Sequence, residues 1–563
     1  MTGDFYKEHV VRAGSLVHVA AVSIAALVLL ALLDPLAAAD RKFYDDDPIA
    51  VEPDPQDASK VLPWDIDLIW DLSYNTFARP GDSTPNVRAR NINTIDEVPD
   101  SSWFTNRILA RSVSDSEAAR GPLTGEGPAP GRWSVIARKS AGAAPGFTVR
   151  DARDQVWFVS FDGAGHPEAA TGALLVANKI FWTLGYWQVE NYLTSVRLDN
   201  LDIAETATFE SRPGHKKVME RGDLEDVLRQ AHRSADGSYR AVAARAIPGT
   251  PLGGFRYHGT RSDDPNDVVP HEHRRELRAL KVFAAWVNLT DMKAGNTLDT
   301  RVTENGRTIV RHYLQDVGSA LGSGALGPHD PDEGWEYLFD GDKMTKRAVS
   351  FGFYLQPWQT ASYEKHVAAG RFEGDAFDPP AWRPRTPSGA FVRARPDDTF
   401  WAARRVQAFS SEMIRAIVKS GAYGDPNAER YIADTLIKRR DKVSAAYLPT
   451  VNPLVGFALG EDGALTFENA AIKADTAAPP SGGYTARWAT FDNATGTTQP
   501  LGETSAPQTT LASPPGLART TGTFVQVAVT ALDQRYPSWG APVTVHFKRQ
   551  PQNWKLVGIE RLP

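Results

Sequence analysis

Residues 286–323 restrict the folds open to this chain more than any other stretch, because they place polar groups at short, fixed spacings. Asp291 is followed by Lys293 and Asn296, and Asp316 stands two residues before a glycine on a later segment. An aspartate that orients a hydroxyl, a lysine, and two oxygen ligands for Mg²⁺ are the groups that a phosphoryl-transfer site needs. The stretch therefore predicts a site where a loop after a helix meets the end of a later strand.

The composition excludes several classes of function. A net charge of −6 and 42% apolar residues among 563 describe an ordinary globular chain of two or three domains. No basic stripe interleaved with aromatic residues occurs, which argues against nucleic acid as a partner. Because the chain contains no cysteine, disulfides and thiolate metal sites are excluded. A metal would be held by carboxylate, amide or imidazole groups, which suit Mg²⁺, Mn²⁺ or Ca²⁺.

The first 39 residues have the pattern of an export signal. A polar start with Lys7 and Arg12 precedes 21 residues without a formal charge, and a run of alanines then ends at Ala39. This pattern favours a signal peptide cleaved after Ala39. The alternative is an uncleaved membrane anchor, because 21 uncharged residues can just span a bilayer. Either reading predicts export to the periplasm or beyond, with membrane contact only through this segment.

Changes in composition and periodicity divide the rest of the chain into four parts. Residues 40–130 are rich in Pro, Asp and Ser and predict an extended arm that packs over another domain. Residues 131–250 begin with three antiparallel strands and a helix, and residues 251–450 are mainly helical. Residues 451–563 alternate in short segments, as in a fibronectin- or immunoglobulin-like β-sandwich. The predicted fold class is α+β: a two-lobed body, with a small lobe and a helical lobe, followed by a β-sandwich.

Several elements can be placed individually. Asn305-Gly306 predicts a type I′ turn, and the resulting hairpin would return the chain so that Asp316 lies beside Asn296. The helix that leads to Asp291 should be amphipathic, with one buried face. The predicted helices are residues 65–72, 167–186, 271–288 and two within 399–448 that are separated at 424–426.

Two further patterns could carry chemistry. A turn with Gly142 and Gly146 between two strands would let backbone amides approach a phosphate, although an ordinary hairpin loop has the same pattern. Acidic residues before the helix at 271–288, among them Asp263 and Glu272, suggest a Ca²⁺ site or the paired carboxylates of a carbohydrate-active enzyme. Their spacing does not match a calcium loop, and capping of the helix start accounts for them equally well.

With these motifs, about residues 130–450 resemble the protein-kinase-like superfamily, nearest to its atypical bacterial branch of HipA-like and CotH-like kinases. The resemblance implies that Asp291 accepts or orients the proton of the acceptor hydroxyl, and that Lys293 neutralises charge on the transferred phosphoryl group. It also implies that Asn296 and Asp316 bind Mg²⁺ beside ATP. The implied substrate is a hydroxyl on a protein or on an envelope glycan.

The chain departs from the family pattern where the nucleotide is gripped. The third strand of the small lobe normally carries a lysine that pairs with a glutamate on the next helix, but Ser160 and Leu174 stand at these two places. Losing both groups together avoids an unpaired charge in a partly buried cleft. Lys139, on a preceding strand, is the candidate replacement, with Glu168 or Glu190 as its partner.

Two functions stay open on these residues. The first is an exported, kinase-like phosphotransferase in which Lys139, Gly142 and Gly146 hold the nucleotide. The second is a degenerate, non-catalytic protein of the cell envelope that uses the same body and the β-sandwich for binding. The scarcity of ATP outside the cytoplasm favours the second, whereas the intact loop favours the first. The sequence does not fix the oligomeric state.

Overall fold

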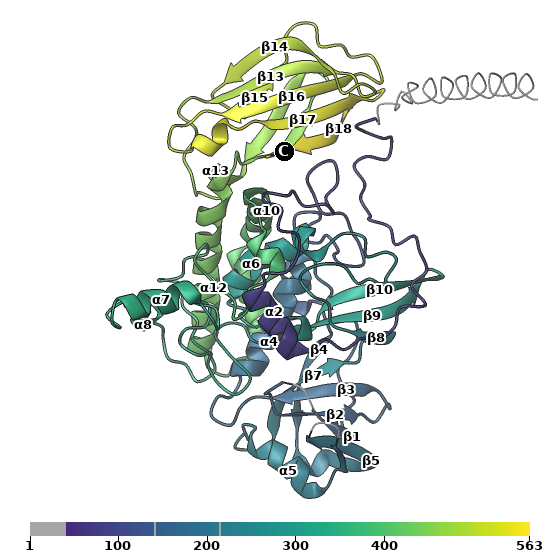
Figure 1. The fold of residues 1–563 in the computed structure, drawn as a ribbon, viewed down its shortest axis with the longest axis vertical. Helices are drawn as coiled ribbons and strands as arrows, with labels where there is room; N and C mark the ends of the chain where they lie inside the picture. Colours follow the sequence, from purple (N-terminus) through teal and green to yellow (C-terminus); the bar gives the residue numbers. More distant parts are fainter. Residues whose placement is uncertain (1–40, 140–141, 213–214, 563) are drawn as a thin grey trace, which may run out of the picture.

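The computed structural model describes residues 41–139, 142–212 and 215–562, so the signal or anchor predicted for residues 1–39 lies outside the described part. None of the described helices is both long and apolar enough to cross a membrane. A seven-stranded sheet and a C-terminal pair of sheets lie at opposite ends of the molecule, with most of the helices between them (Figure 1). The α+β fold, with two lobes and a C-terminal β-sandwich, is confirmed.

The sheet of the small lobe has the strand order β4-β7-β3-β2-β1-β5-β6. Strands β1, β2 and β3 pair antiparallel in chain order, as the alternating segments predict, and β1 also pairs in parallel with β5. Side chains such as Val135, Phe147 and Phe161 fill a core of their own beneath the sheet. The strands are β1 (Trp133–Arg138), β2 (Gly146–Arg150), β3 (Val156–Phe161), β4 (Asn191–Val196), β5 (Leu201–Arg212), β6 (His215–Val218) and β7 (Tyr239–Arg245).

Helix α4 (Ala169–Leu184) follows β3 and is buried along most of its length, which confirms the helix predicted over 167–186. It ends at Gly185, where φ is 132°, a conformation that favours glycine. A β-carbon at this position would lie 2.3 Å from the ring of Phe104. The glycine therefore ends the helix and lets the arm approach its C-terminus.

One residue of α4 is costly to bury. Lys179 is 5% exposed, forms no ion pair with the described residues, and has its pKa lowered by burial from 10.5 to about 8. The folded protein thus binds this proton less tightly than the unfolded chain does. The free energy of unfolding should therefore rise with pH between those two values.

Replacing Lys179 with methionine, which has a similar volume, is expected to raise the free energy of unfolding at pH 7 by up to about 3 kcal/mol. The gain should shrink toward pH 10, where the lysine is neutral in the folded state. Urea denaturation at both pH values measures this difference. Lys473→Met is the control, because that side chain is 69% exposed. A Lys179→Met protein that is less stable at both pH values would show that the ammonium makes a contact that the fold needs.

Helix α6 (Arg275–Val287) occupies most of the predicted range 271–288, but residues His271–His273 form a separate 3₁₀ turn. The expectation of a single buried face is wrong, because all but one of the residues of α6 are buried. Polar side chains of this helix face elements that are distant in the sequence. Its periodicity could not reveal what covers those polar positions.

Buried ion pairs hold α6 to its surroundings. Arg275 is fully buried and lies 2.8 Å from Asp96 of the arm, 2.9 Å from Asp397 and 3.0 Å from Asp398. Arg278 shares Asp398, also at 3.0 Å. The arm and a later helix together supply the carboxylates that allow these guanidinium groups to be buried.

A hairpin follows α6 and its loop. Asn305 and Gly306 have φ values of 51° and 76°, as a type I′ turn requires, so the predicted turn is confirmed. The register pairs Thr297 with Leu314. The residues just outside this pair therefore meet at the open end of the hairpin. The sheet consists of β8 (Thr250–Gly253), β9 (Thr297–Glu304) and β10 (Arg307–Leu314).

Three helices, not the predicted two, complete the helical lobe. The break predicted at 424–426 is present. A second break lies at Ser410, whose Oγ accepts a hydrogen bond from the backbone N of Met413 at 2.9 Å. Such a cap starts a new helix without interrupting the apolar periodicity. The helices are α10 (Pro396–Gln407), α11 (Ser411–Lys419) and α12 (Pro426–Tyr447).

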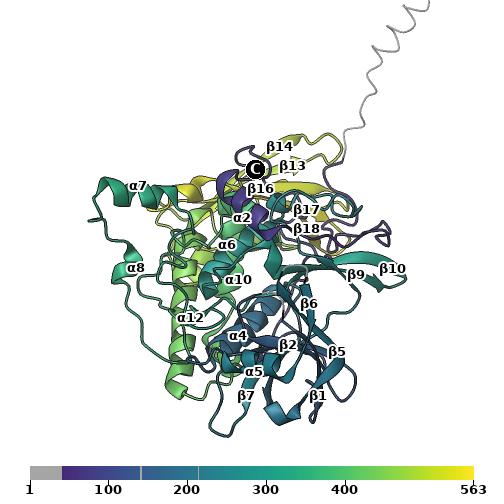
Figure 2. The same cartoon turned by 60° about the horizontal axis from the view of Figure 1, so that its bottom comes forward.

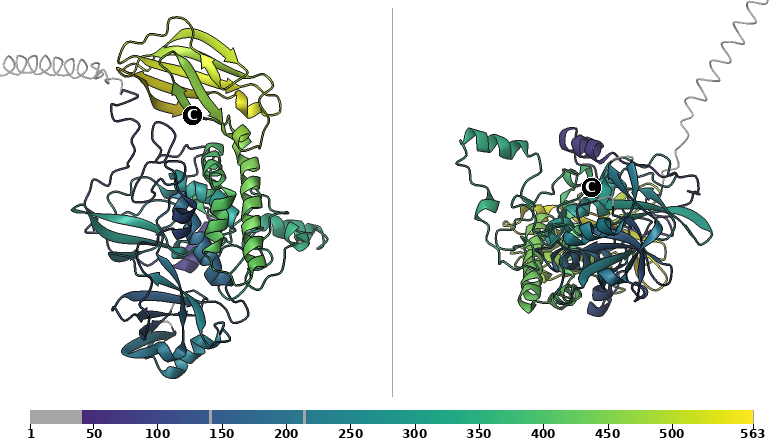
Figure 3. Two further views of the ribbon diagram at one scale, coloured as in Figure 1. Left: turned by 180° about the vertical axis from the view of Figure 1, so that it is seen from behind. Right: turned by 90° about the horizontal axis from the view of Figure 1, so that it is seen from below.

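Shorter helices lie on the surface and in the connections. The helix predicted over 65–72 begins at residue 68, because Asp67 accepts hydrogen bonds from the backbone N of Ile69 and of Trp70. Helices α2 and α7 project from the same side of the molecule (Figure 3). These elements are α2 (Leu68–Phe77), α3 (Asp115–Arg120), α5 (Arg221–Arg229), α7 (Gly341–Val349), α8 (Pro357–Thr360), α9 (Gly389–Val392) and α13 (Ala470–Lys473).

The C-terminal part is a β-sandwich of one sheet with the order β11-β12-β15 and another with the order β14-β13-β16-β17-β18. Val525, Val527 and Val529 alternate along β16 and are fully buried, as the period of two predicts. Its apolar core continues into that of the helical lobe. The strands are β11 (Leu454–Leu459), β12 (Ala464–Asn469), β13 (Tyr484–Phe491), β14 (Thr498–Ala506), β15 (Thr510–Ala512), β16 (Phe524–Ala531), β17 (Val543–Arg549) and β18 (Trp554–Glu560).

The arm starts on the β-sandwich and runs along the helical lobe (Figure 2). The ring of Phe43 lies 5.9 Å from that of Phe491 and 6.3 Å from that of Phe524. Further along, Phe104 forms a backbone bridge with Tyr186, directly after α4. The arm thus touches all three other parts. The exact domain boundaries at residues 130, 250 and 450 stay predictions.

Candidate active site

The loop after α6 carries the first two predicted site residues. Asn288 ends α6 in the left-handed conformation, with φ 53°, which turns the chain out of the helix axis. Lys293 then forms an ion pair with Asp291 at 2.8 Å, and the two side chains are 41% and 35% exposed. Both groups are therefore accessible to a substrate while they hold each other in place.

The hairpin brings the other two residues to this loop. The amide Nδ2 of Asn296 donates to the carbonyl of Asp291 at 2.7 Å, and the carbonyl of Asn296 accepts from the backbone N of both Gln315 and Asp316 at 3.0 Å. Asp316 in turn accepts from the backbone N of Gly318 at 2.9 Å. The four polar residues predicted from the sequence thus form one connected group.

Lys139 directly follows β1 and is influenced by the charge of this group. Its ammonium lies 3.4 Å from the Oγ of Ser160, which stands where the family lysine is expected. Burial lowers the pKa of Lys139, and the nearby charge of Asp316 opposes that shift. The ammonium is therefore close enough to Asp316 to feel its charge.

Two glycines of the predicted turn lie near the same lysine. A β-carbon at Gly142, where φ is 78°, would lie 3.6 Å from the ammonium nitrogen of Lys139, and one at Gly146 would lie 2.3 Å from the carbonyl oxygen of Val159. Gly146 therefore cannot carry a side chain without moving β3. Both glycines leave space beside the lysine side chain.

The glutamates considered as partners of Lys139 are engaged elsewhere, so that expectation is wrong. Glu168 accepts a hydrogen bond from the backbone N of Gly424 at 2.8 Å. Glu190 accepts from the Oγ1 of Thr124 at 2.8 Å. Leu174, at the expected glutamate position of α4, faces Gly318 instead, 3.7 Å from where its β-carbon would be. An apolar side chain thus stands where the expected ion pair would need a carboxylate.

Sequence reasoning missed a second set of polar residues behind the loop that carries Asp291. The carboxylate of Glu333 accepts from the Oγ1 of Thr290, next to Asp291, at 2.5 Å. The Nε2 of His329 lies 2.9 Å from the Oγ of Ser319. Burial lowers the pKa of His329, while the charges of Glu333 and Asp291 oppose the shift. These residues stand in an irregular segment without a motif, so nothing local in the sequence marks them.

The acidic residues near 263–272 do not form the alternative sites. Asp263 accepts from the guanidinium of Arg261 at 3.1 Å and from the backbone N of Leu62 at 3.0 Å. Glu272 accepts from the backbone N of Gly259 and of Asp82, each at 2.7 Å. These carboxylates therefore satisfy donors of the protein. Among the described residues, no group of three or more His, Asp or Glu is arranged to hold a metal.

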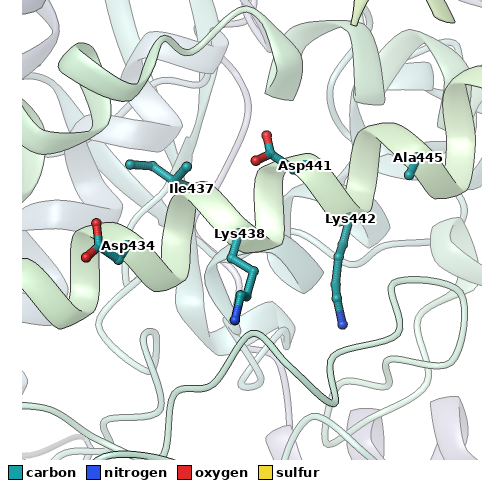
Figure 4. Close-up of a pocket in the computed structure, with 6 residues that line it drawn as sticks. All are labelled: Asp434, Ile437, Lys438, Asp441, Lys442 and Ala445. Carbon is teal, nitrogen blue, oxygen red and sulfur yellow. The ribbon is translucent and has the colours of Figure 1, made fainter. Parts of the chain in front are cut away.

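A shallow hollow of about 460 Å³ lies elsewhere, on the outer face of α12. Lys438 and Lys442 point the same way, away from Asp434 and Asp441 (Figure 4). Lys442 donates to the carbonyl of Phe377 at 3.0 Å. The charges of the hollow alternate in sign and are used in local contacts, which is typical of a solvated helix face.

Comparison with known proteins gives distant structural similarity only. No family model and no curated protein matches the sequence. The Helicobacter pylori proinflammatory kinase CtkA is 12% identical over 55% of this chain and 93% of its own, with a TM-score of 0.29. The Golgi casein kinase is 9% identical over 56% of this chain and 72% of its own, with a TM-score of 0.29. Its structure with Mn/ADP bound is 9% identical over 71% of this chain and 94% of its own, with a TM-score of 0.30. At such TM-scores the likeness does not establish the activity or the bacterial branch.

Proposed function

We propose that this protein is an exported, kinase-like phosphotransferase that moves the γ-phosphoryl group of ATP to a hydroxyl, with Mg²⁺. The observation that carries the proposal is the hydrogen-bonded group of Asp291, Asn296 and Asp316. Lys139 of the small lobe is near enough for the charge of Asp316 to oppose the lowering of its pKa. These groups are all suited to nucleotide phosphates and a hard cation.

The donor set fits a magnesium ion shared with a nucleotide. One oxygen of Asp316 accepts from Gly318, and the Oδ1 of Asn296 accepts no hydrogen bond from the described residues. Two oxygen ligands are too few for a resident metal, but Mg²⁺ is commonly held by one or two side chains together with substrate phosphates. When bound, the ion would neutralise charge on the phosphates.

Each residue of the loop then has a distinct role. Asp291 orients the acceptor hydroxyl and takes its proton as that oxygen attacks the γ-phosphorus. The bond from phosphorus to the bridging oxygen breaks, and ADP leaves. Lys293, which is held by Asp291 at 2.8 Å, offsets charge on the transferred group. Lys139 takes the place of the missing strand lysine, and Gly142 and Gly146 leave room for the phosphates above it.

The substrate and the location follow from the same proposal. The pattern of the first 39 residues supports export to the periplasm or beyond, where the proposed acceptor is a hydroxyl of a protein or an envelope glycan. The affinity for ATP should be modest, because Leu174 leaves Lys139 without the usual glutamate partner. A non-catalytic envelope protein with the same body is the alternative, and the test below separates the two.

Mg²⁺-ATP at ten times its dissociation constant is expected to raise the free energy of unfolding by about 1.4 kcal/mol, seen as a higher Tm. Asp316→Ala should abolish the shift, and Lys139→Met should reduce it, since each removes a group that faces the phosphates. Asp375→Ala is the matched control, because that carboxylate is 84% exposed on a loop. Differential scanning fluorimetry measures all four proteins. No shift at millimolar Mg²⁺-ATP would favour the non-catalytic alternative.

A further inference from the structure

A pocket of about 360 Å³ adjoins the candidate catalytic loop. Its wall includes Glu333, whose carboxylate accepts a hydrogen bond from Thr290, the residue before Asp291. It also includes Arg371, whose guanidinium donates to the carbonyl of His329. The volume is at the small end of the range for small-molecule sites, about 300–1,000 Å³. We name it the aromatic pocket, and its residues used below are Glu333, Trp335, Trp358, Tyr363, Arg371 and Glu373.

The aromatic pocket has three aromatic side chains, those of Trp335, Trp358 and Tyr363. Hydrogen bonds hold Trp358 and Tyr363 in place. The indole Nε1 of Trp358 donates to Glu336 at 2.5 Å, and the Nε of Arg371 donates to the hydroxyl of Tyr363 at 3.0 Å. Trp335 and Trp358 are both half-buried, so part of each side chain faces solvent. Aromatic rings that are fixed in advance bind a flat apolar surface at little cost in conformational entropy.

A buried carboxylate in the aromatic pocket lacks a full set of donors. Glu373 is 8% exposed, and its Oε2 accepts from the backbone N of Ala376 at 2.7 Å. Its Oε1 accepts no hydrogen bond from the described residues. The guanidinium of Arg439 donates to the backbone carbonyl of Glu373 at 2.7 Å, and not to this carboxylate. The Oε1 of Glu373 therefore lacks a hydrogen-bond donor among the described residues.

The charges of the wall disfavour anionic ligands. Carboxylates outnumber the guanidinium of Arg371 among the lining residues, which disfavours phosphates and other anions. A cationic side chain would suit these carboxylates, and the test below includes a lysine-rich peptide for that reason. A neutral ligand with several hydroxyl groups would use the acceptors and the donors alike, and the apolar face of its ring would lie on an indole.

We infer that the aromatic pocket binds a sugar ring of a neutral glycan and presents one of its hydroxyl groups to Asp291. The inference rests on the proposed function for the transfer step, but the binding of the sugar does not. It narrows the acceptor from any hydroxyl to a hydroxyl on a carbohydrate. The ring would lie against Trp335, two residues after Glu333, with a hydroxyl donating to the Oε1 of Glu373.

The test measures the binding of neutral tetrasaccharides without nucleotide. Cellotetraose, maltotetraose, chitotetraose and xylotetraose are titrated into the full chain and followed by saturation-transfer NMR and calorimetry. At least one should bind, and Trp335→Ala and Glu373→Gln should each weaken it at least tenfold. Tyr44→Ala is the matched control, because that aromatic side chain is 54% exposed where the arm starts on the β-sandwich, and it should leave the affinity unchanged.

Further measurements distinguish a failure of the sugar-binding inference from a failure of the proposed function. Mg²⁺-ATP should still raise the Tm of Trp335→Ala, which also shows that the variant is folded. A glycan that binds while ATP gives no shift would support the pocket and overturn only the phosphotransferase. Failure of all four tetrasaccharides, binding unaffected by both pocket variants, or tighter binding of a lysine-rich peptide would each overturn the inference.

Discussion

Replacing Arg275 with methionine is expected to lower the free energy of unfolding by about 4 kcal/mol, the range found when one partner of a buried ion pair is removed. The guanidinium is fully buried and faces Asp96, Asp397 and Asp398 at 2.8 to 3.0 Å. Without this guanidinium, the carboxylates of the arm and of α10 stay buried with less positive charge beside them. Guanidinium chloride denaturation, followed by far-UV circular dichroism, measures the loss.

Arg415→Met is the matched control for this prediction. Arg415 forms an equally short ion pair with Asp434, at 2.6 Å, but the two side chains are 51% and 52% exposed. Exposed pairs contribute about 0.2–1 kcal/mol, so this variant should stay close to the original protein. Equal losses in both variants would show that burial does not set the strength of these pairs.

Replacing Asp291 with asparagine is expected to lower the rate of phosphoryl transfer about 10³-fold, the size of effect that a general base contributes. Asparagine has nearly the same shape, but it cannot take the proton of the acceptor hydroxyl. The measurement is release of ADP in the presence of a bound tetrasaccharide, or of the protein's own hydroxyl groups as acceptors. Activity is compared at saturating Mg²⁺-ATP, so that only the chemical step differs.

Two further results are expected in the experiment with Asp291→Asn. Mg²⁺-ATP should still raise its Tm, because Asp291 does not hold the metal. Asp375→Asn, on an exposed loop, should keep full activity. A fully active Asp291→Asn protein would remove Asp291 from the chemistry and leave its ion pair with Lys293, at 2.8 Å, as a structural contact only.

The parts of the fold that the sequence predicts well are those specified locally. Asn305-Gly306 determines its own turn, Gly185 ends α4, and the strands of the small lobe follow their alternation. Asp291, Lys293 and Asn296 precede one hairpin and Asp316 follows it, so the hairpin brings the four residues together. In each case the deciding contact lies within a few residues or across one turn.

The parts that it predicts poorly depend on contacts between distant segments. The polar face of α6 is buried because Asp96 and Asp398 cover Arg275, and no pattern within the helix shows this. Glu168 and Glu190 could be proposed from the sequence as partners of Lys139. In the structure, Glu168 instead accepts a hydrogen bond from the backbone N of Gly424 in the helical lobe. Glu333, Trp335 and Glu373 lie in irregular segments, so the aromatic pocket is visible only once the chain is folded.

The arm's first contact has a consequence for how such a chain matures. Phe43 is synthesised long before the rings that enclose it, Phe491, Phe524 and His546. Loop closure across so many residues is slow, and the contact cannot form before the β-sandwich has been translated. A fold that is completed so late would suit the proposed export, in which a polypeptide is threaded through a translocation channel before it folds.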